Sequence, residues 1–226
     1  MTRLLDLGIQ HIQQIVMDMS RISGDSVLRS IESYEKNVNV KKEIFEWSEM
    51  LRVMQDEVAD LAIESIARYQ PVATDLRFIR SCMEIAYGFS RYGRYSFDIV
   101  DVLETIGPIS ECDKSAVLMM ANKVRQMILL GINGLQARDK TIAEKLYELD
   151  DAVDSIYRTF LRGSRPHIHE KEKADKTVKT STNSSDPKCY ISALLILRFL
   201  ERISDHACYI GDSVHYIVTG DSRPRR

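Results

Sequence analysis

The stretch Leu200-Glu201-Arg202-Ile203-Ser204-Asp205-His206 lies inside a long segment whose apolar residues recur every three or four positions. This period places the apolar side chains on one face of a helix. The segment therefore predicts a helix from about Tyr190 to Val218, with Gly220 in a good position to end it. The apolar positions are Ile191, Leu195, Phe199, Ile203, Ile210, Val214 and Ile217.

Two acidic residues of this stretch, Glu201 and Asp205, are four positions apart. On a helix their carboxylates lie one turn above each other, close enough to share a cation. The spacing occurs again in two earlier helical segments, at Asp150 with Asp154 and at Asp56 with Asp60. The repetition of this pair makes these residues candidates for metal binding.

The composition favours long helices and an all-α fold. Only 10 Gly and 5 Pro occur in 226 residues, and helix-forming residues are abundant. The formal net charge is -2, from 31 basic and 33 acidic side chains. This balance lacks the basic surplus of a nucleic-acid-binding protein, so no nucleic-acid partner is expected.

The cysteines and the hydropathy indicate a cytoplasmic protein. Cys82, Cys112, Cys189 and Cys208 are scattered and form no Cys-x-x-Cys pair, so we expect thiols in a reducing compartment. The N-terminal residues have no signal-peptide pattern, and no window is apolar over the roughly 18 residues that a membrane span requires.

Six helices are expected along the chain. The first runs from Thr2 to about Tyr34, and the second surrounds an apolar seam from Ile44 to Leu61 and stops near Gln70, before Pro71. The others cover residues 74–106, 111–137, 141–162 and 190–218. The predicted helix starts are Thr74 as an N-cap, Ser110 as an N-cap with Asp113 three residues later, and a Thr141-x-x-Glu144 capping box.

A Gly107-Pro108 break divides these helices into two groups of three. The chain is expected to consist of two halves, residues 1–107 and 108–226, with a polar loop at 163–188 in the second half. The acidic pairs Asp56/Asp60 and Asp150/Asp154 align at an offset of 94, whereas residues 89–94 align with 200–205 at an offset of 111. The polar loop accounts for the difference, which indicates a duplicated unit.

Three strings resemble the PhoU family, whose members are associated with phosphate-specific transporters and phosphate-responsive signalling. They are residues 71–77 (Pro-Val-Ala-Thr-Asp-Leu-Arg), residues 200–206 and residues 214–220 (Val-His-Tyr-Ile-Val-Thr-Gly). The resemblance implies two pseudo-symmetric three-helix bundles, often in a homodimer. It also implies metal binding through acidic residues, in some members by multinuclear iron or zinc clusters.

Carried over residue by residue, the resemblance implies a metal site at Asp150, Asp154, Glu201 and Asp205. Four converging carboxylates repel one another, so a cation is physically called for. The candidate ions are Fe, Zn, Mg and Mn; the oxygen donors also suit Ca, and the sequence does not select among these metals.

The first half departs from the family pattern. Where the family has a Glu and an Asp, this chain has Ser90 and Arg94. The expected arrangement is therefore asymmetric: metal in the second half, and in the first half a salt bridge from Arg94 to Asp56 and Asp60.

The resemblance implies a non-enzymatic, metal-binding regulator of phosphate-specific transport and phosphate-responsive signalling. Its expected partners are the ATPase subunit of a phosphate ABC transporter and, where one exists, a sensor histidine kinase, with membrane contact only through the transporter. One alternative is a carboxylate-bridged di-metal enzyme, although the Glu-x-x-His motif of such bundles is missing and Ser204 stands three residues after Glu201. A purely structural oligomerisation module is the other alternative.

Overall fold

The computed structural model describes residues 4–163 and 186–222, which form six α-helices. This confirms the all-α prediction. The helices are α1 (Leu4–Lys36), α2 (Lys41–Tyr69), α3 (Thr74–Ile106), α4 (Ser115–Ala137), α5 (Ile142–Gly163) and α7 (Pro187–Thr219). In the described part of the chain, no helix is long and apolar enough to cross a membrane.

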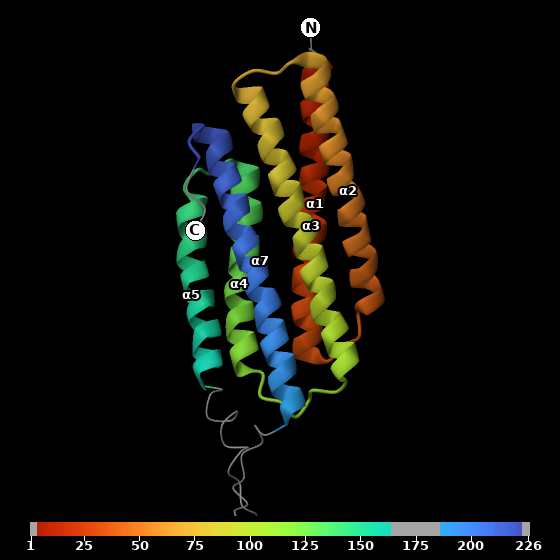
Figure 1. Ribbon diagram of the computed structural model, residues 1–226, viewed down its shortest axis with the longest axis vertical. Helices are drawn as coiled ribbons and strands as arrows, with labels where there is room; N and C mark the ends of the chain where they lie inside the picture. Colours follow the sequence, from red (N-terminus) through yellow and green to blue (C-terminus); the bar gives the residue numbers. More distant parts are fainter. Residues whose placement is uncertain (1–3, 164–185, 223–226) are drawn as a thin grey trace, which may run out of the picture.

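The helices form two three-helix bundles that pack against each other. Helices α1, α2 and α3 contact one another, as do α4, α5 and α7. The bundles meet mainly where α3 and α7 run antiparallel side by side, and α1 also contacts α4 (Figure 1). Buried apolar side chains from all six helices make one continuous cluster, so the bundles share a hydrophobic core.

The periodic stretch that opens the sequence becomes the buried face of α7. Leu200, Ile203 and Ala207 are fully buried, and Ile210 and Val214 are nearly so. This face is broad because α7 packs against α3, α4 and α5 together. Residues between these positions point toward α5 or toward solvent, which leaves room there for charged side chains.

Several helix ends differ from the prediction because other residues cap them. Thr74 is the first residue of α3 rather than its N-cap; Ala73 precedes the helix with a φ of 45°. α4 begins at Ser115, four residues later than expected. There Lys114, not Ser110, is the N-cap residue, and the Asp113 carboxylate before it accepts hydrogen bonds from the Ser115 backbone N–H (2.8 Å) and hydroxyl (3.0 Å).

The other ends follow the expected chemistry more closely. Gly107 ends α3 with a φ of 81°, a conformation that glycine adopts without strain. Thr141 directly precedes α5. α7 begins at Pro187, three residues earlier than predicted, because the Asp186 side chain accepts a hydrogen bond from the Lys188 N–H at 2.9 Å and proline suits the first helical position. Most of the predicted polar loop, residues 164–185, lies outside the described residues.

The prediction of four free thiols was wrong for two of them. Cys112 and Cys189 form a disulfide, with their Cα atoms 5.4 Å apart and 77 positions between them in sequence. Cys82 and Cys208 are free and buried in the core. Sequence spacing could not show the pairing, because Cys112 lies between α3 and α4 whereas Cys189 lies in the first turn of α7.

Candidate acidic site between two helices

The four predicted site residues lie on two neighbouring helices of the second bundle. Asp150 and Asp154 belong to α5, and Glu201 and Asp205 belong to α7. α5 and α7 pack along each other (Figure 1). All four side chains are partly buried, and each pair stands on one face of its helix because its members are four residues apart.

Asp150 is held by a serine of the facing helix. Its Oδ1 accepts a hydrogen bond from the Ser204 hydroxyl at 2.6 Å, and the same hydroxyl lies 3.0 Å from the sulfur of Met127 on α4. Ser204 is fully buried, so this contact fixes the register between α5 and α7. It also occupies the position at which a di-metal bundle would carry a histidine ligand.

The Glu201 side chain is only 14% exposed, compared with 32% for Asp154 and for Asp205. Its Oε1 accepts a hydrogen bond from Arg198 Nη1 at 2.6 Å. Its Oε2 is buried and has no hydrogen-bond partner, and the Nε of Arg202 is 3.9 Å away. A buried carboxylate oxygen without a partner is costly, and a bound cation would relieve that cost.

Asp154 and Asp205 have arginine partners on their own helices. Asp154 pairs with Arg158 one turn further along α5. Asp205 accepts a long hydrogen bond, 3.5 Å, from Arg202. These contacts neutralise part of the charge at the edge of the site and leave its centre acidic.

Burial and mutual repulsion disturb the ionisation of three carboxyls. The pKa of Asp150 is raised by burial and by the charges of Asp205, Asp154 and Asp151, against the lowering effect of the Ser204 hydrogen bond. The pKa of Glu201 is raised by burial and then by Asp205.

Asp205 behaves in the same way. Its pKa is raised mainly by burial and also by Asp154, whereas Arg202 and Arg198 lower it. The four residues are therefore close enough to repel one another, which is the electrostatic condition for binding a cation.

The donor set suits a hard divalent or iron-type cation, since every ligand is a carboxylate oxygen. The buried Oε2 of Glu201, which has no hydrogen-bond partner, belongs to this donor set. The side chains are, however, turned toward their arginine and serine partners. Over residues 4–163 and 186–222, no three His, Cys, Asp or Glu side chains converge as ligands of one ion. Binding would require these side chains to turn toward one another.

In the first half, the ion pairs at the corresponding place differ from the predicted ones. Arg94 pairs with Asp98, one turn along α3, at 3.0 Å, and Asp56 pairs with Arg52 at 3.6 Å. The predicted salt bridge from Arg94 to Asp56 and Asp60 is therefore wrong. Asp98 lies one helical turn from Arg94 on the same face and is the nearer partner. Asp56 and Asp60 are both exposed.

His206 is a packed side chain beside the acidic site. It is 8% exposed and contacts the rings of Tyr87, Tyr95 and Tyr209, with ring centroids 5.5–5.9 Å apart. Burial, reinforced by the positive charges of Arg91 and Arg202, lowers its pKa to about 4. The imidazole is therefore neutral near pH 7 and ties α7 to α3 through aromatic contacts.

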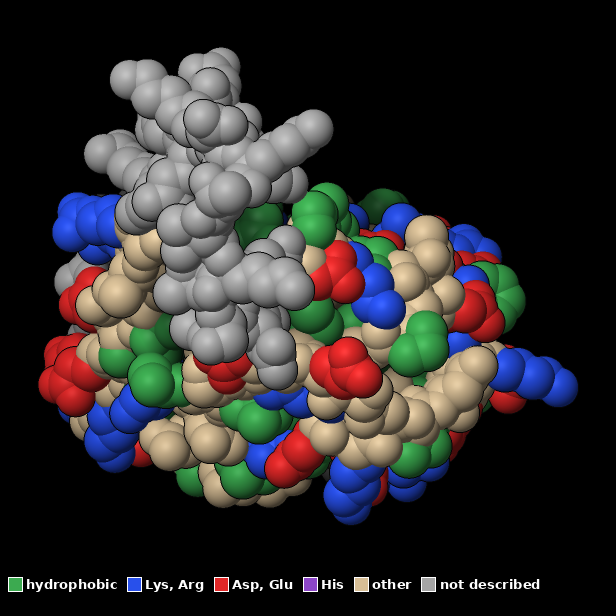
Figure 2. All heavy atoms as spheres, turned by 90° about the horizontal axis from the view of Figure 1, so that it is seen from below, with side chains coloured by type: hydrophobic (Ala, Val, Ile, Leu, Met, Phe, Trp, Pro, Cys, Tyr) green, Lys and Arg blue, Asp and Glu red, His purple; other side chains and the backbone are tan. Residues whose placement is uncertain are grey.

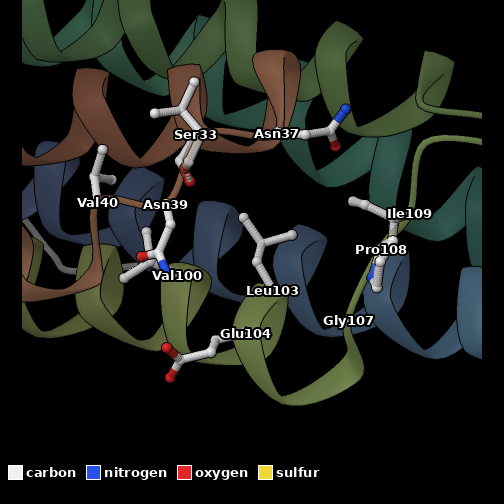
Figure 3. Close-up of a pocket in the computed structure, with 11 residues that line it drawn as sticks. Ser33, Asn37, Asn39, Val40, Val100, Leu103, Glu104, Gly107, Pro108 and Ile109 are labelled. Atoms are coloured by element: carbon white, nitrogen blue, oxygen red, sulfur yellow. Dashed lines mark hydrogen bonds between the residues drawn. The ribbon is translucent and has the colours of Figure 1, made fainter.

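A hollow outside this site lies where the two bundles are connected. It has a volume of about 270 Å³ and is enclosed by the α1–α2 turn, the end of α3 and residues 107–109 (Figure 3). Its polar groups already have partners: the Ser33 hydroxyl donates to the Val38 carbonyl, Asn39 accepts from Lys41, and Glu104 pairs with the Lys41 ammonium. The hollow therefore has an apolar wall, and these three polar side chains already make contacts within the protein.

The end of the molecule that carries this connection presents charges of both signs. On the part of that end visible in Figure 2, acidic and basic side chains are interspersed and do not gather into a continuous basic surface. Such a surface does not resemble the electrostatic footprint of a polyanion-binding protein.

The arginines that pair with the acidic side chains were not among the predicted site residues. Arg198 stands three residues before Glu201, and Arg158 stands four residues after Asp154. Both spacings put the two side chains on one helix face, so the ion pairs could have been predicted. The contact between Ser204 and Asp150 had no such signal, because it depends on the register between two helices.

Comparison with known proteins agrees with this architecture. The model of the PhoU domain matches residues 16–103 and 117–214. A "phosphate-specific transport system accessory protein PhoU homolog" of Clostridium acetobutylicum is 25% identical over 224 residues, covering 97% of each chain. The PhoU homolog 1 of Methanothermobacter thermautotrophicus is 28% identical over 225 residues, covering 96% of this chain and 93% of its own.

Solved structures show the same fold. The phosphate transport system regulatory protein PhoU of Streptococcus pneumoniae superposes with a TM-score of 0.79 at 16% identity, over 97% of this chain and 99% of its own. PhoU of Pseudomonas aeruginosa gives a TM-score of 0.72 at 21% identity, over 96% and 99% of the two chains. The family model matches both helical bundles and most of the chain, and this protein therefore belongs to the PhoU family.

Proposed function

We propose that this protein is a non-enzymatic accessory regulator of a phosphate-specific transport system. The observation that carries the proposal is the match of the PhoU domain to both bundles. Relatives aligned over nearly the whole chain are named accessory proteins of such systems, which supports the assignment. The chain acts through protein contacts, with the ATPase subunit of the transporter as first partner and a sensor histidine kinase as second partner where one exists.

The proposed location is the cytoplasmic side of the membrane, as a homodimer that reaches the membrane only through the transporter. The proposed cofactor is a divalent or iron-type ion (Fe, Zn, Mg or Mn) held by Asp150, Asp154, Glu201 and Asp205. Support comes from the raised pKa values of three of these carboxyls and from the partnerless oxygen of Glu201. The ion would neutralise their repulsion and hold α5 to α7.

The metal-binding halves are proposed to be unequal. The first half has exposed Asp56 and Asp60, while Ser90 and Arg94 stand where the family has an acidic pair. Because Arg94 already pairs with Asp98, an arginine salt bridge rather than a metal occupies this face. A regulator with one loaded half would respond to the metal through the second bundle only.

A di-metal oxidase or hydrolase is less well supported. Such enzymes require a histidine three residues after a ligating glutamate, and here that position is Ser204, whose hydroxyl binds Asp150. No observation in the described residues favours catalysis over regulation.

The partner proposal is tested by purifying the tagged protein from cells grown with high and with low phosphate. The transporter ATPase subunit is expected in the same fraction, in amounts that differ between the two conditions. A purified protein that carries no transporter component under either condition would refute the assignment.

Elemental analysis of the same samples tests the metal. Glu201→Ala is expected to lose bound metal, while the matched Asp56→Ala variant in the first half retains it. Equal losses in both variants would contradict the asymmetric arrangement, and metal-free wild-type protein would contradict the site itself.

A further inference from the structure

The connection between the two bundles, residues 107–114, is linked to other parts of the fold by the hydrogen bonds of Lys114 and by the disulfide of Cys112. At its end, the Lys114 ammonium donates hydrogen bonds to the Tyr34 carbonyl at 2.7 Å and to Asn37 Oδ1 at 2.9 Å. Both acceptors lie at the C-terminal end of α1. Two residues earlier, Cys112 is bonded to Cys189 of α7. One end of α1 and one end of α7 are thus tied to the same connection.

The surroundings of Cys189 favour its thiolate. It lies in the first turn of α7, where Asp186 is the N-cap and Pro187 occupies the first helical position. Backbone N–H groups at a helix N-terminus stabilise a negatively charged sulfur. In an exchange reaction the sulfur that is better stabilised as a thiolate departs more readily, so Cys189 is suited to be the leaving group.

The two bonded cysteines also differ in accessibility from the two free ones. Cys112 and Cys189 are partly exposed, whereas Cys82 and Cys208 are 2% and 3% exposed. Burial raises the pKa of the Cys82 thiol to about 12, which makes it still less reactive. A reagent in solution would therefore reach the first pair and not the second.

Contacts besides the disulfide also hold the first turns of α7. The Tyr190 ring stacks on Phe160 with centroids 5.5 Å apart, and the Ser192 hydroxyl bonds back to the Cys189 carbonyl within the same helix. Ile191 is 48% exposed. From Ala193 onward the helix is anchored by the shared core. The disulfide adds a covalent link between the start of α7 and residues 107–114.

We propose that Cys112 and Cys189 form a reversible redox site that exchanges with a protein or small-molecule dithiol. The dithiol's thiolate attacks the sulfur of Cys112, the Cys112–Cys189 bond breaks, and Cys189 leaves as a thiolate that is then protonated. The second thiol of the reagent displaces Cys112 from the mixed disulfide. Two protein thiols result, and the reagent becomes a disulfide; the reverse sequence closes the site.

Opening the bond releases two segments at once. The first turn of α7 loses its covalent anchor, whereas residues 107–114 stay attached through the Lys114 hydrogen bonds and through the buried side chain of Ile109. Gly107, Pro108 and Ile109 line the hollow at this end, so its wall becomes movable as well (Figure 3). The rest of the fold is expected to stay in place, because the fully buried core is made by other side chains and Cys112 is only partly buried against it. This inference does not depend on the proposed role in phosphate transport.

The test uses the full-length purified protein. Oxidised protein is treated with dithiothreitol, labelled with iodoacetamide without denaturation, and mapped by mass spectrometry. Labelling is expected at Cys112 and Cys189 only, and addition of excess oxidised dithiothreitol or glutathione before labelling is expected to abolish it. A protein that forms no Cys112–Cys189 bond under oxidising conditions, or whose bond resists dithiothreitol in the native state, overturns the proposal.

Hydrogen exchange provides the structural readout. Reduction is expected to speed amide exchange about tenfold or more in residues 107–114 and 187–192, as local opening becomes easier, and to leave residues 79–100 of α3 unchanged. The Cys82→Ala/Cys208→Ala variant should respond like wild type, whereas Cys112→Ser should exchange fast with or without reductant. Equal exchange in the oxidised and reduced wild-type protein would refute the coupling to α7.

Discussion

The substitution Asp205→Asn tests whether the acidic site is a cluster under electrostatic strain. Asp205 is a cause of the raised pKa of both Asp150 and Glu201, and its own side chain is 32% exposed. Removing its charge relieves that repulsion but also removes one long contact to Arg202. At 3.5 Å and with both side chains partly exposed, this contact contributes roughly 0–1 kcal/mol to the free energy of unfolding.

After allowance for solvent screening, the metal-free variant is expected to be more stable than wild type by about 0.5–1 kcal/mol at pH 7. For a chain of this size that corresponds to a rise in Tm of about 1–4 °C. A carboxyl with a raised pKa in the fold stabilises the protein only while protonated, and that contribution is lost as the pH rises through the raised pKa. The advantage of the variant should accordingly vanish at about pH 3, where these carboxyls are protonated in both states.

Thermal unfolding followed by circular dichroism, in chelator and then with Mn²⁺ or Mg²⁺, measures both effects. At a cation concentration about a hundred times Kd, wild type should gain about 2.7 kcal/mol, and Asp205→Asn should gain clearly less. The matched control Asp56→Asn should behave as wild type in both buffers. The reasoning would be refuted by a metal-free Asp205→Asn variant that is less stable than wild type, or by equal cation stabilisation of both.

Three further predictions follow from single contacts. Ile203→Ala should lower the free energy of unfolding by about 2–5 kcal/mol in urea titrations, because this side chain is fully buried in the shared core; a loss below 1 kcal/mol would contradict that packing. Tyr147→Phe removes a 2.6 Å hydrogen bond to Asp212 and should cost about 1–2 kcal/mol in the same assay, with no loss expected if the bond is absent in solution. His206→Phe keeps an aromatic ring in place but removes the titrating imidazole. Because the pKa of His206 in the folded protein is about 4, below the ordinary 6.5, the wild-type protein should lose stability as the pH falls from about 6.5 to 4, by at most about 3 kcal/mol. The variant should lose less over the same pH range. Parallel pH profiles of the two proteins would exclude His206 as the cause.

The helices could be predicted from the sequence because each buries a periodic apolar face. The stretch from Ile203 to Ile217 shows the reason most clearly, since its apolar positions lie on the buried face of α7, whereas Ile191 and Leu195 of the same periodic series are 48% and 37% exposed. The helix starts were less predictable. The prediction of Ser110 as an N-cap was wrong, because α4 begins only at Ser115, whose backbone N–H and hydroxyl donate hydrogen bonds to Asp113.

The candidate site could be predicted as far as spacing within one helix allows. Spacing within one helix placed Glu201 with Asp205 and Asp150 with Asp154, and the structure brings the two pairs together between α5 and α7. Whether they bind metal stays a prediction. Contacts between helices could not be predicted from the sequence. Arg94 was expected to reach another helix but pairs with Asp98 on its own helix. The pairing of Cys112 with Cys189 depends on where residues 107–114 pass the start of α7.

The antiparallel packing of α3 on α7 makes the two halves of this protein mutually dependent for folding. Each half contributes a central helix, and part of the apolar surface of that helix is covered by the other half. A chain cut within residues 109–113 would give two fragments that each expose this face, so we expect them to aggregate alone and to reassemble when produced together. Each half therefore needs the other to bury its central helix, so we expect the two halves to unfold together.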